Sequence, residues 1–224
     1  MNIYGKMGCL LMAAGISSAQ VTFSEYPVPS GLAYIIKAGS DHNLWFTEAN
    51  ANMIGRITIA GVVTEFPLPT PCSRPIGVAS GADGNIWFTE ALGNRIGRIT
   101  PSGVITEFPV PSSSSYPYGI ASGPDGNLWF VEADGNRIGR ITLTGTITEF
   151  PIPTPGSGAN FLTAGPDGNV WFVEGVGSKI GKITASGVVT EYPLPASGGN
   201  ANFITAGPDG NLWFSEFGLT KLQR

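Results

Sequence analysis

Short apolar stretches recur along this chain at a fixed interval. The phrase Asn-(Leu/Ile/Val)-Trp-Phe-x-Glu occurs five times, with tryptophans 42 residues apart at Trp45, Trp87, Trp129, Trp171 and Trp213. Around Trp129, apolar runs bounded by Gly, Pro, Asn and Asp predict four short strands, at 118–122, 127–132, 137–142 and 146–151. No stretch has helical periodicity. A repeat of this length with four strands is typical of a propeller blade.

The turns between the predicted strands support this division. Asp-Gly-Asn steps at 83–85, 125–127, 167–169 and 209–211 supply the Asp-Gly pair that tight hairpins prefer, and His42 replaces the glycine in the first copy. Between the third and fourth strands we expect a two-residue loop such as Ser102-Gly103. Such a loop predicts an opposed pair of charged residues in each blade. The pairs are Arg56 with Glu65, Arg98 with Glu107, Arg140 with Glu149 and Lys182 with Glu191.

The predicted fold class is all-β, a β-propeller of five four-stranded blades that forms a single domain over residues 20–224. Residues 21–27 are predicted to form a fourth strand without a blade of their own, and the last copy reaches only its predicted third strand at Arg224. Pairing the two would place Arg224 opposite Glu25 and close the ring, which predicts a monomer. The alternative is an open arc of a truncated, larger propeller, whose exposed edges would favour dimers or aggregation.

Composition and charge exclude some partners. The chain of 224 residues is 12% charged with a net charge of −4, so it lacks the basic surface that nucleic-acid binding requires. Residues 1–19, with Lys6 before an apolar run and Ser17-Ser18-Ala19 after it, predict a signal peptide and a secreted or periplasmic protein. The alternative is a plain N-terminal tail or a misassigned start. No other segment is apolar enough to span a membrane, and Cys72 is left without a disulfide partner once Cys9 leaves with the signal.

Three phrases of the repeat resemble a known family. They are Gly-Pro-Asp-Gly-Asn-Leu-Trp-Phe at 123–130, Asn-Arg-Ile-Gly-Arg-Ile-Thr at 136–142 and Ile-Thr-Glu-Phe-Pro-Ile-Pro at 147–153. The repeat resembles the streptogramin B lyase family, also called the virginiamycin B lyase family, over residues 21–224. The resemblance implies blades of the same type, seven in that family. It also implies an elimination that opens the lactone ring of a cyclic depsipeptide, with a general base and Mg²⁺.

The histidines that the family uses as catalytic residues are missing here. The matching inner-strand column reads Tyr34, Ile76, Tyr118, Asn160 and Asn202, and the only histidine, His42, stands in a hairpin turn. Asparagine does not titrate and tyrosine has a pKa of about 10, so the column holds no base for neutral pH and we assign no catalytic residue. We predict instead a small-molecule site at the channel mouth, made by Tyr34, Tyr118, Asn160 and Asn202. The alternative is that these side chains only fill a narrow channel.

A column of glutamates follows the tryptophans: Glu48, Glu90, Glu132, Glu174 and Glu216. The resemblance implies metal-binding glutamates, which predicts Mg²⁺ ligands among Glu132, Glu174 and Glu216. A glutamate present in every copy also suits a structural role, and the tryptophans are expected to pack between blades rather than bind ligand.

Two functions remain open on these grounds. The resemblance implies a Mg²⁺-assisted lyase, whereas the missing histidines favour a non-catalytic secreted propeller that binds a small molecule or a protein, with loops such as 111–116 and 155–160 at its surface. A gene fragment without a function of its own is a third interpretation.

Overall fold

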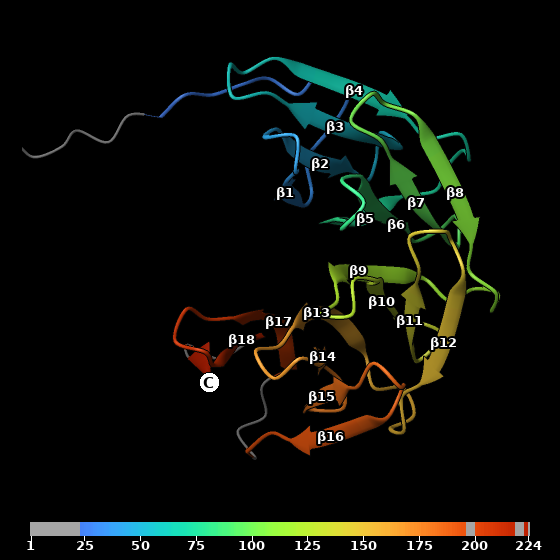
Figure 1. Cartoon of the computed structure of the whole chain (residues 1–224), viewed down its shortest axis with the longest axis vertical. Helices are drawn as coiled ribbons and strands as arrows, with labels where there is room; N and C mark the ends of the chain where they lie inside the picture. The colour runs from blue at the N-terminus through green and yellow to red at the C-terminus, as the bar shows by residue number, and fades with distance from the viewer. Residues whose placement is uncertain (1–22, 196–199, 218–221, 224) are drawn as a thin grey trace, which may run out of the picture.

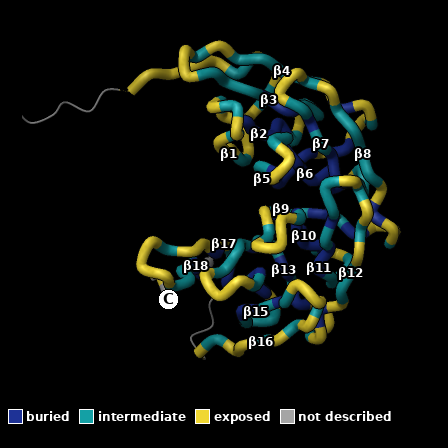
Figure 2. The backbone as a smooth tube through the Cα atoms, in the orientation of Figure 1, coloured by how far each residue is buried: buried dark blue, intermediate teal, exposed yellow. Residues whose placement is uncertain are grey.

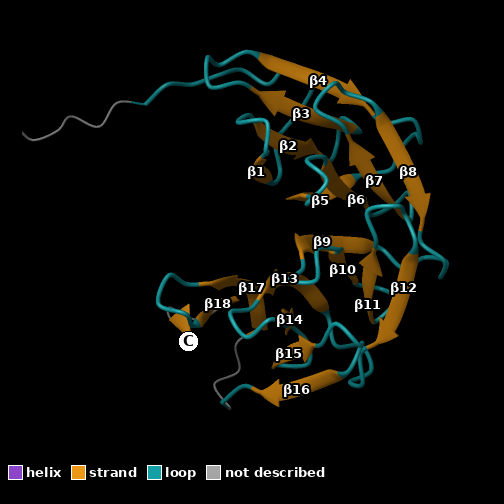
Figure 3. Cartoon of the chain, in the orientation of Figure 1, coloured by secondary structure: helices purple, strands orange, loops and turns teal. Residues whose placement is uncertain are grey.

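The computed structural model describes residues 23–195, 200–217 and 222–223, and these residues form strands and loops but no helix (Figure 3). Nothing in this part of the chain therefore provides a helix that could cross a bilayer. The first four sheets each have four antiparallel strands. They comprise β1 (Ile36–Ala38), β2 (Leu44–Glu48), β3 (Met53–Ile57) and β4 (Val63–Pro67); β5 (Pro75–Ser80), β6 (Ile86–Glu90), β7 (Arg95–Ile99) and β8 (Ile105–Pro109); β9 (Pro117–Ser122), β10 (Leu128–Glu132), β11 (Arg137–Ile141) and β12 (Ile147–Pro151); and β13 (Ala159–Ala164), β14 (Val170–Glu174), β15 (Lys179–Ile183) and β16 (Val189–Pro193). The fifth sheet has β17 (Asn200–Ala206), β18 (Leu212–Phe217) and β19 (Leu222–Gln223).

The strand pattern of the repeat is confirmed. In the third copy every predicted strand end lies within one residue of the strand that forms, from β9 to β12. The hairpin between the first two strands of each sheet also forms as expected, with Gly84, Gly126, Gly168 and Gly210 at positive φ. His42 takes the same conformation with φ 61°, so it serves as a turn residue at this position.

The five sheets follow one another around an open arc (Figure 1). Strands β1, β5, β9, β13 and β17 line its concave side, and β4, β8, β12 and β16 form its outer rim. Neighbouring sheets pack through buried side chains, as where Trp87 and Ile96 of the second sheet meet Ile120 and Leu128 of the third. Figure 2 shows these buried positions as dark blue tubes between the sheets. The arrangement is that of propeller blades, as the repeat predicted.

The five-bladed ring closure predicted from the register is not present. Residues 23–28 form no strand, the fifth sheet has only three strands among the described residues, and the arc stays open between the first and fifth sheets (Figure 1). Five sheets at this curvature turn through less than a full circle, so the two partners cannot meet. Arg224, predicted to face Glu25, lies outside the described residues, as does the predicted signal peptide, residues 1–19.

The segment 23–30 nevertheless contacts the first sheet. Its contacts match those that the outer strand of one sheet, and the loop after it, make with the next sheet along the arc. The Tyr26 ring lies against Gly61, as the Phe66 ring lies against Gly103 one repeat later. Ser30 donates to the Glu65 carboxylate from its amide (2.9 Å) and its hydroxyl (2.7 Å). The segment therefore occupies the place of an outer strand without a sheet of its own.

The predicted register between the third and fourth strands is wrong by one residue. Gly97, not Arg98, faces Glu107, and Arg98 faces Thr106; the other three complete sheets repeat this shift. The loop has three residues, closed by paired Thr100 and Val104 with Gly103 at φ 92°, instead of two. A shift of one residue moves a side chain to the opposite face of the sheet, so the predicted Arg–Glu pairs do not form.

The arginines and glutamates instead tie neighbouring blades together. Arg98 lies 5.5 Å from the Trp87 ring centroid and donates to the Leu143 carbonyl of the next sheet at 3.2 Å. Glu107 accepts hydrogen bonds from the amide (3.0 Å) and hydroxyl (2.6 Å) of Thr70, in the loop that follows the preceding sheet. Charge-assisted bonds of this kind are stronger than neutral ones, so these residues fix how one blade sits on the next.

Three of the five tryptophans are core residues, as predicted, whereas Trp171 and Trp213 are only partly buried. Trp45, Trp87 and Trp129 are fully buried and each stacks on an outer-strand phenylalanine of its own sheet. The indole N–H of each also donates to the aspartate of the preceding turn, for example Trp87 to Asp83 at 3.2 Å. None of the three is exposed enough to stack on a ligand.

Candidate functional site

The predicted ligand residues lie at one end of the concave side, in irregular parts of the inner strands. In β9 the two residues Tyr118 and Gly119 stand opposite one residue of β10, Val131, which is a β-bulge. Asn160 in β13 and Asn202 in β17 occupy equivalent bulges. A bulge bends the strand and re-aims its side chains, and bulges are common beside binding sites. The repeat therefore sets these positions apart from the regular ladder.

Four aromatic residues form a cluster at this end, here called the aromatic cluster: Tyr34, which precedes β1, Tyr118 of β9, Phe161 of β13 and Phe203 of β17. The hydroxyls of Tyr34 and Tyr118 are 3.0 Å apart. Tyr118 packs edge-on against Phe161 at 5.2 Å between ring centroids, and Phe161 stacks on Phe203 at 4.2 Å. Tyr34 and Phe203 are more than half exposed, so the cluster presents aromatic surface to solvent. Concave aromatic surfaces with a few polar groups are typical of small-molecule sites.

The polar neighbours of the aromatic cluster give it no general base. Burial, followed by the hydrogen bond with Tyr34, raises the pKa of Tyr118, which keeps its hydroxyl protonated at neutral pH. Tyr116 stacks on Tyr118 and accepts a hydrogen bond from Arg74 at 2.9 Å. His42 lies in the turn between β1 and β2, whereas Tyr34 lies before the start of β1. The imidazole is therefore at the opposite end of this hairpin from the aromatic cluster.

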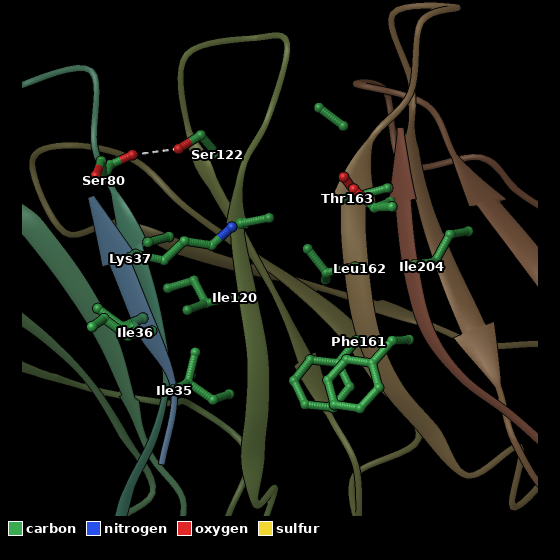
Figure 4. Close-up of a pocket in the computed structure, with 17 residues that line it drawn as sticks. Ile35, Ile36, Lys37, Ser80, Ile120, Ser122, Phe161, Leu162, Thr163 and Ile204 are labelled. Atoms are coloured by element: carbon green, nitrogen blue, oxygen red, sulfur yellow. Dashed lines mark hydrogen bonds between the residues drawn. The ribbon is translucent and has the colours of Figure 1, made fainter. Parts of the chain in front are cut away.

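A cavity of about 580 Å³ continues from the aromatic cluster along the concave side (Figure 4). Its walls are residues of the inner strands β1, β5, β9, β13 and β17, most of them aliphatic, such as Val78, Ile120 and Leu162. Phe161 and Phe203 belong both to this cavity and to the aromatic cluster. Together the cavity and the aromatic cluster form one groove, called the central groove below.

The residues predicted from the sequence lie beside the cavity and not in its walls. Tyr34 and Tyr118 do come together, whereas Asn160 and Asn202 lie at equivalent positions of the next two strands and, like the tyrosines, do not line the cavity. The missed residues are Lys37, Phe161 and Phe203. Phe161 and Phe203 stand where other copies have Gly77 and Gly119. Comparing the repeat copies column by column would have revealed these departures.

The glutamate column lies inside the blades and not in the groove. Glu132 is fully buried, with an oxygen 3.9 Å from Arg137 and with Glu149 of the outer strand as a neighbour. Burial raises the pKa of Glu132 to about 7, and the charge of Glu149 adds to the rise. The Ser115 hydroxyl beside it donates its proton to the Ser112 carbonyl (2.9 Å), so within the described structure the Glu132 oxygens are left without a hydrogen bond.

The predicted magnesium ligands do not fit a common metal site. Glu132, Glu174 and Glu216 lie on β10, β14 and β18, one in each of three successive sheets, and all are buried. Nowhere in the described ranges do three or more His, Cys, Asp or Glu side chains gather closely enough to hold a metal ion. Mg²⁺ binds one or two carboxylates and keeps several waters, which a fully buried carboxylate cannot accommodate. The raised pKa of Glu132 and Glu174 instead reflects their structural burial.

These antiparallel blades define a β-propeller-type protein with a groove on its concave side. The chain belongs to the virginiamycin B lyase family, whose sequence profile matches residues 10–224. This confirms the resemblance carried by the repeat.

Solved and curated relatives agree with that assignment. The virginiamycin B lyase of Staphylococcus aureus is 48% identical and superposes with a TM-score of 0.86, over 91% of this chain and 69% of that one. A streptogramin B lyase structure is 43% identical with a TM-score of 0.84, over 88% and 66% of the two chains. About a third of each solved relative therefore has no counterpart here. A virginiamycin B lyase of Bordetella parapertussis is 44% identical over 52 residues, 22% of this chain and 17% of that protein.

Proposed function

We propose that this chain is a small-molecule-binding member of the virginiamycin B lyase family, secreted or periplasmic, that does not catalyse ring opening. The observation that carries the proposal is the central groove, where an exposed aromatic cluster meets an aliphatic cavity of about 580 Å³. Groups of this kind bind apolar and aromatic ligands. The groove contains no imidazole, and its Tyr118 stays protonated, which supports binding without proton abstraction.

The ligand class that fits best is a cyclic depsipeptide with aromatic side chains. One solved relative is a catalytically inactive histidine-to-alanine variant of the Staphylococcus aureus enzyme with quinupristin. That variant pairs a ligand with a family member that has lost a histidine, which is the combination proposed here. Quinupristin is therefore the test ligand.

A second candidate is the lyase activity of the family, favoured by the 48% identity to the Staphylococcus aureus enzyme. Elimination would need a base and Mg²⁺, and the glutamates predicted to hold the metal are buried in separate sheets. The same experiment decides between the two candidates, because elimination changes retention without changing mass and hydrolysis adds one water.

The experiment measures quinupristin binding to the full chain by isothermal titration calorimetry, and follows the antibiotic by chromatography with mass detection in Mg²⁺ or EDTA. We expect saturable binding and unchanged antibiotic. Phe161→Ala should weaken binding about tenfold, since it removes a stacked ring from the groove. The control Ile59→Ala changes an exposed residue of an outer hairpin loop and should bind like the parent chain. A Mg²⁺-dependent product of unchanged mass would establish the lyase instead, and absence of binding would refute the proposal.

A further inference from the structure

Lys37 is the single charged residue among the described side chains that line the cavity. Its side chain extends from β1 toward β9, and the aliphatic residues Ile36 and Ile120 line the same cavity (Figure 4). No described carboxylate lies within 4.0 Å of its ammonium group. Lys37 is exposed on the concave side, and a cation without a counter-ion beside apolar walls favours an anionic occupant, because such walls focus its field.

Lys37 departs from the repeat at a position where the other blades have small residues. Each residue of this column pairs with the tryptophan of its own sheet, so the five lie at one level of the arc. They are Lys37, Ala79, Ala121, Thr163 and Thr205. Since four blades form without a cation at this level, blade packing does not require Lys37.

The opposite wall supplies matching polar groups and an apolar floor. Thr163 and Thr205 bring hydroxyls to the level of Lys37 from β13 and β17. Two residues earlier on the same strands lie the stacked rings of Phe161 and Phe203, 4.2 Å apart. The groove thus has one level with an ammonium group and hydroxyls, and a second level with aromatic surface.

We propose that the central groove binds an organic carboxylate with an aromatic or apolar body, with the carboxylate at Lys37, Thr163 and Thr205 and the body on Phe161 and Phe203. This inference rests on the proposed function, that the groove binds small molecules, and adds the charge of the ligand. The body gains affinity by burial, while the carboxylate orients the molecule along the groove.

The test compares 3-phenylpropanoate with its neutral amide, 3-phenylpropanamide, by calorimetry on the full chain at low salt. We expect the carboxylate to bind about three- to tenfold more tightly, with the preference decreasing at 0.5 M NaCl because salt screens the ammonium group. Lys37→Gln should abolish the preference while leaving the amide affinity unchanged, and Lys37→Arg should keep it. The control Lys182→Gln makes the same charge change beside Trp171, outside the groove, and should keep the preference.

Each outcome separates this inference from the proposed function. Equal affinity for the two probes, or a preference that survives Lys37→Gln, would overturn the carboxylate site and leave the groove as a neutral binding site. If neither probe binds but quinupristin does, the carboxylate site is again refuted. Failure of all three ligands, on a chain shown to be folded by circular dichroism, would refute both proposals.

Discussion

Two sheet faces built from the same repeat positions differ sharply in burial. In the third sheet Ile120 and Leu128 are 7% and 0% exposed, because the second sheet packs on them. In the first sheet the equivalent Ile36 and Leu44 are 53% and 44% exposed. The comparison shows that the repeat specifies an apolar face at each position, whereas the neighbouring blade decides whether that face becomes core.

The outer half of the first sheet is covered by another segment of the chain, whereas its inner half is not. There the segment 23–30 provides the contacts of a preceding outer strand, with Tyr26 at Gly61 and Ser30 at Glu65. Ile36 and Leu44, nearer the concave side, have no such cover. One short segment can therefore replace a blade at the rim but not at the core of the interface.

The largest expected effect is on the free energy of unfolding, and it distinguishes the buried face of the third sheet from the exposed face of the first sheet. Leu128→Ala should lower the free energy of unfolding by about 2–5 kcal/mol, because it leaves a cavity in a packed interface. Leu44→Ala, the matched change on the first sheet, should cost less, about 1 kcal/mol, since 44% of its surface is already exposed. Urea denaturation of both variants checks this. Equal losses would mean that the first face is covered in solution.

The next effect concerns the buried glutamates, which occur both at the covered rim and in the interior. Burial raises the pKa of Glu90 to about 7, and the same holds for Glu48, which lies beside Gly31, directly after the segment 23–30. Unfolding returns each to about 4.5, so between these values the folded state binds more protons. Stability from these groups is complete below about pH 4.5 and is lost as the pH rises through 7. Melting temperatures should therefore fall from pH 5 to pH 7.5.

Glu90→Gln should remove this dependence at one site. The amide needs no proton, so the variant should be more stable than the parent by about 1–3 kcal/mol at pH 8 and nearly unchanged at pH 5. Glu48→Gln should behave alike if the segment 23–30 replaces a blade at the rim. Melting temperatures that do not vary with pH in the parent chain would contradict both expectations.

Local sequence patterns predicted the strands of each blade. The register of the outer strands and the closure of the ring depend on longer-range geometry, and these two predictions were wrong. The strands from β9 to β12 followed from apolar runs and turn residues, since both act over a few residues. The Arg98–Glu107 pairing failed because a loop of three residues instead of two, with Gly103 at positive φ, has nearly the same sequence signal. Ring closure failed because curvature is set by the packing between blades, for which the sequence of one repeat contains no direct signal.

The sequence identified candidate site residues only in the one repeat position where the family has its catalytic histidines. Tyr34 and Tyr118 were found because they replace the expected histidines, and the structure brings their hydroxyls together. Lys37 and Phe161 were missed because they stand in neighbouring columns, where a cation and a ring replace small residues. Which columns face one cavity depends on bulges and sheet packing, which appear only in three dimensions.

A smaller effect tests the bonds that fix one blade on the next. Thr70→Val removes a hydroxyl that donates to Glu107 and should cost about 1–2 kcal/mol, since hydrogen bonds to charged groups are the stronger kind. Ser30→Ala removes the matching bond to Glu65 in a more exposed setting and should cost less than about 1 kcal/mol. Denaturation midpoints at one pH compare the two. A larger loss for Ser30→Ala would show that the rim segment, rather than the interior bond, limits stability.

The smallest effect on folding, and the sharpest test of the open face, comes from Leu44→Lys. A charge at this exposed position should change the free energy of unfolding by less than about 0.5 kcal/mol. The variant should nonetheless reduce self-association measured by light scattering, because a contiguous apolar surface favours contact between copies of the chain. Val104→Lys, at an exposed position in the loop between β7 and β8, is the control and should not alter association. If the two variants and the parent chain scatter alike at all concentrations, the apolar face is not a contact surface, and its exposure has no consequence in solution.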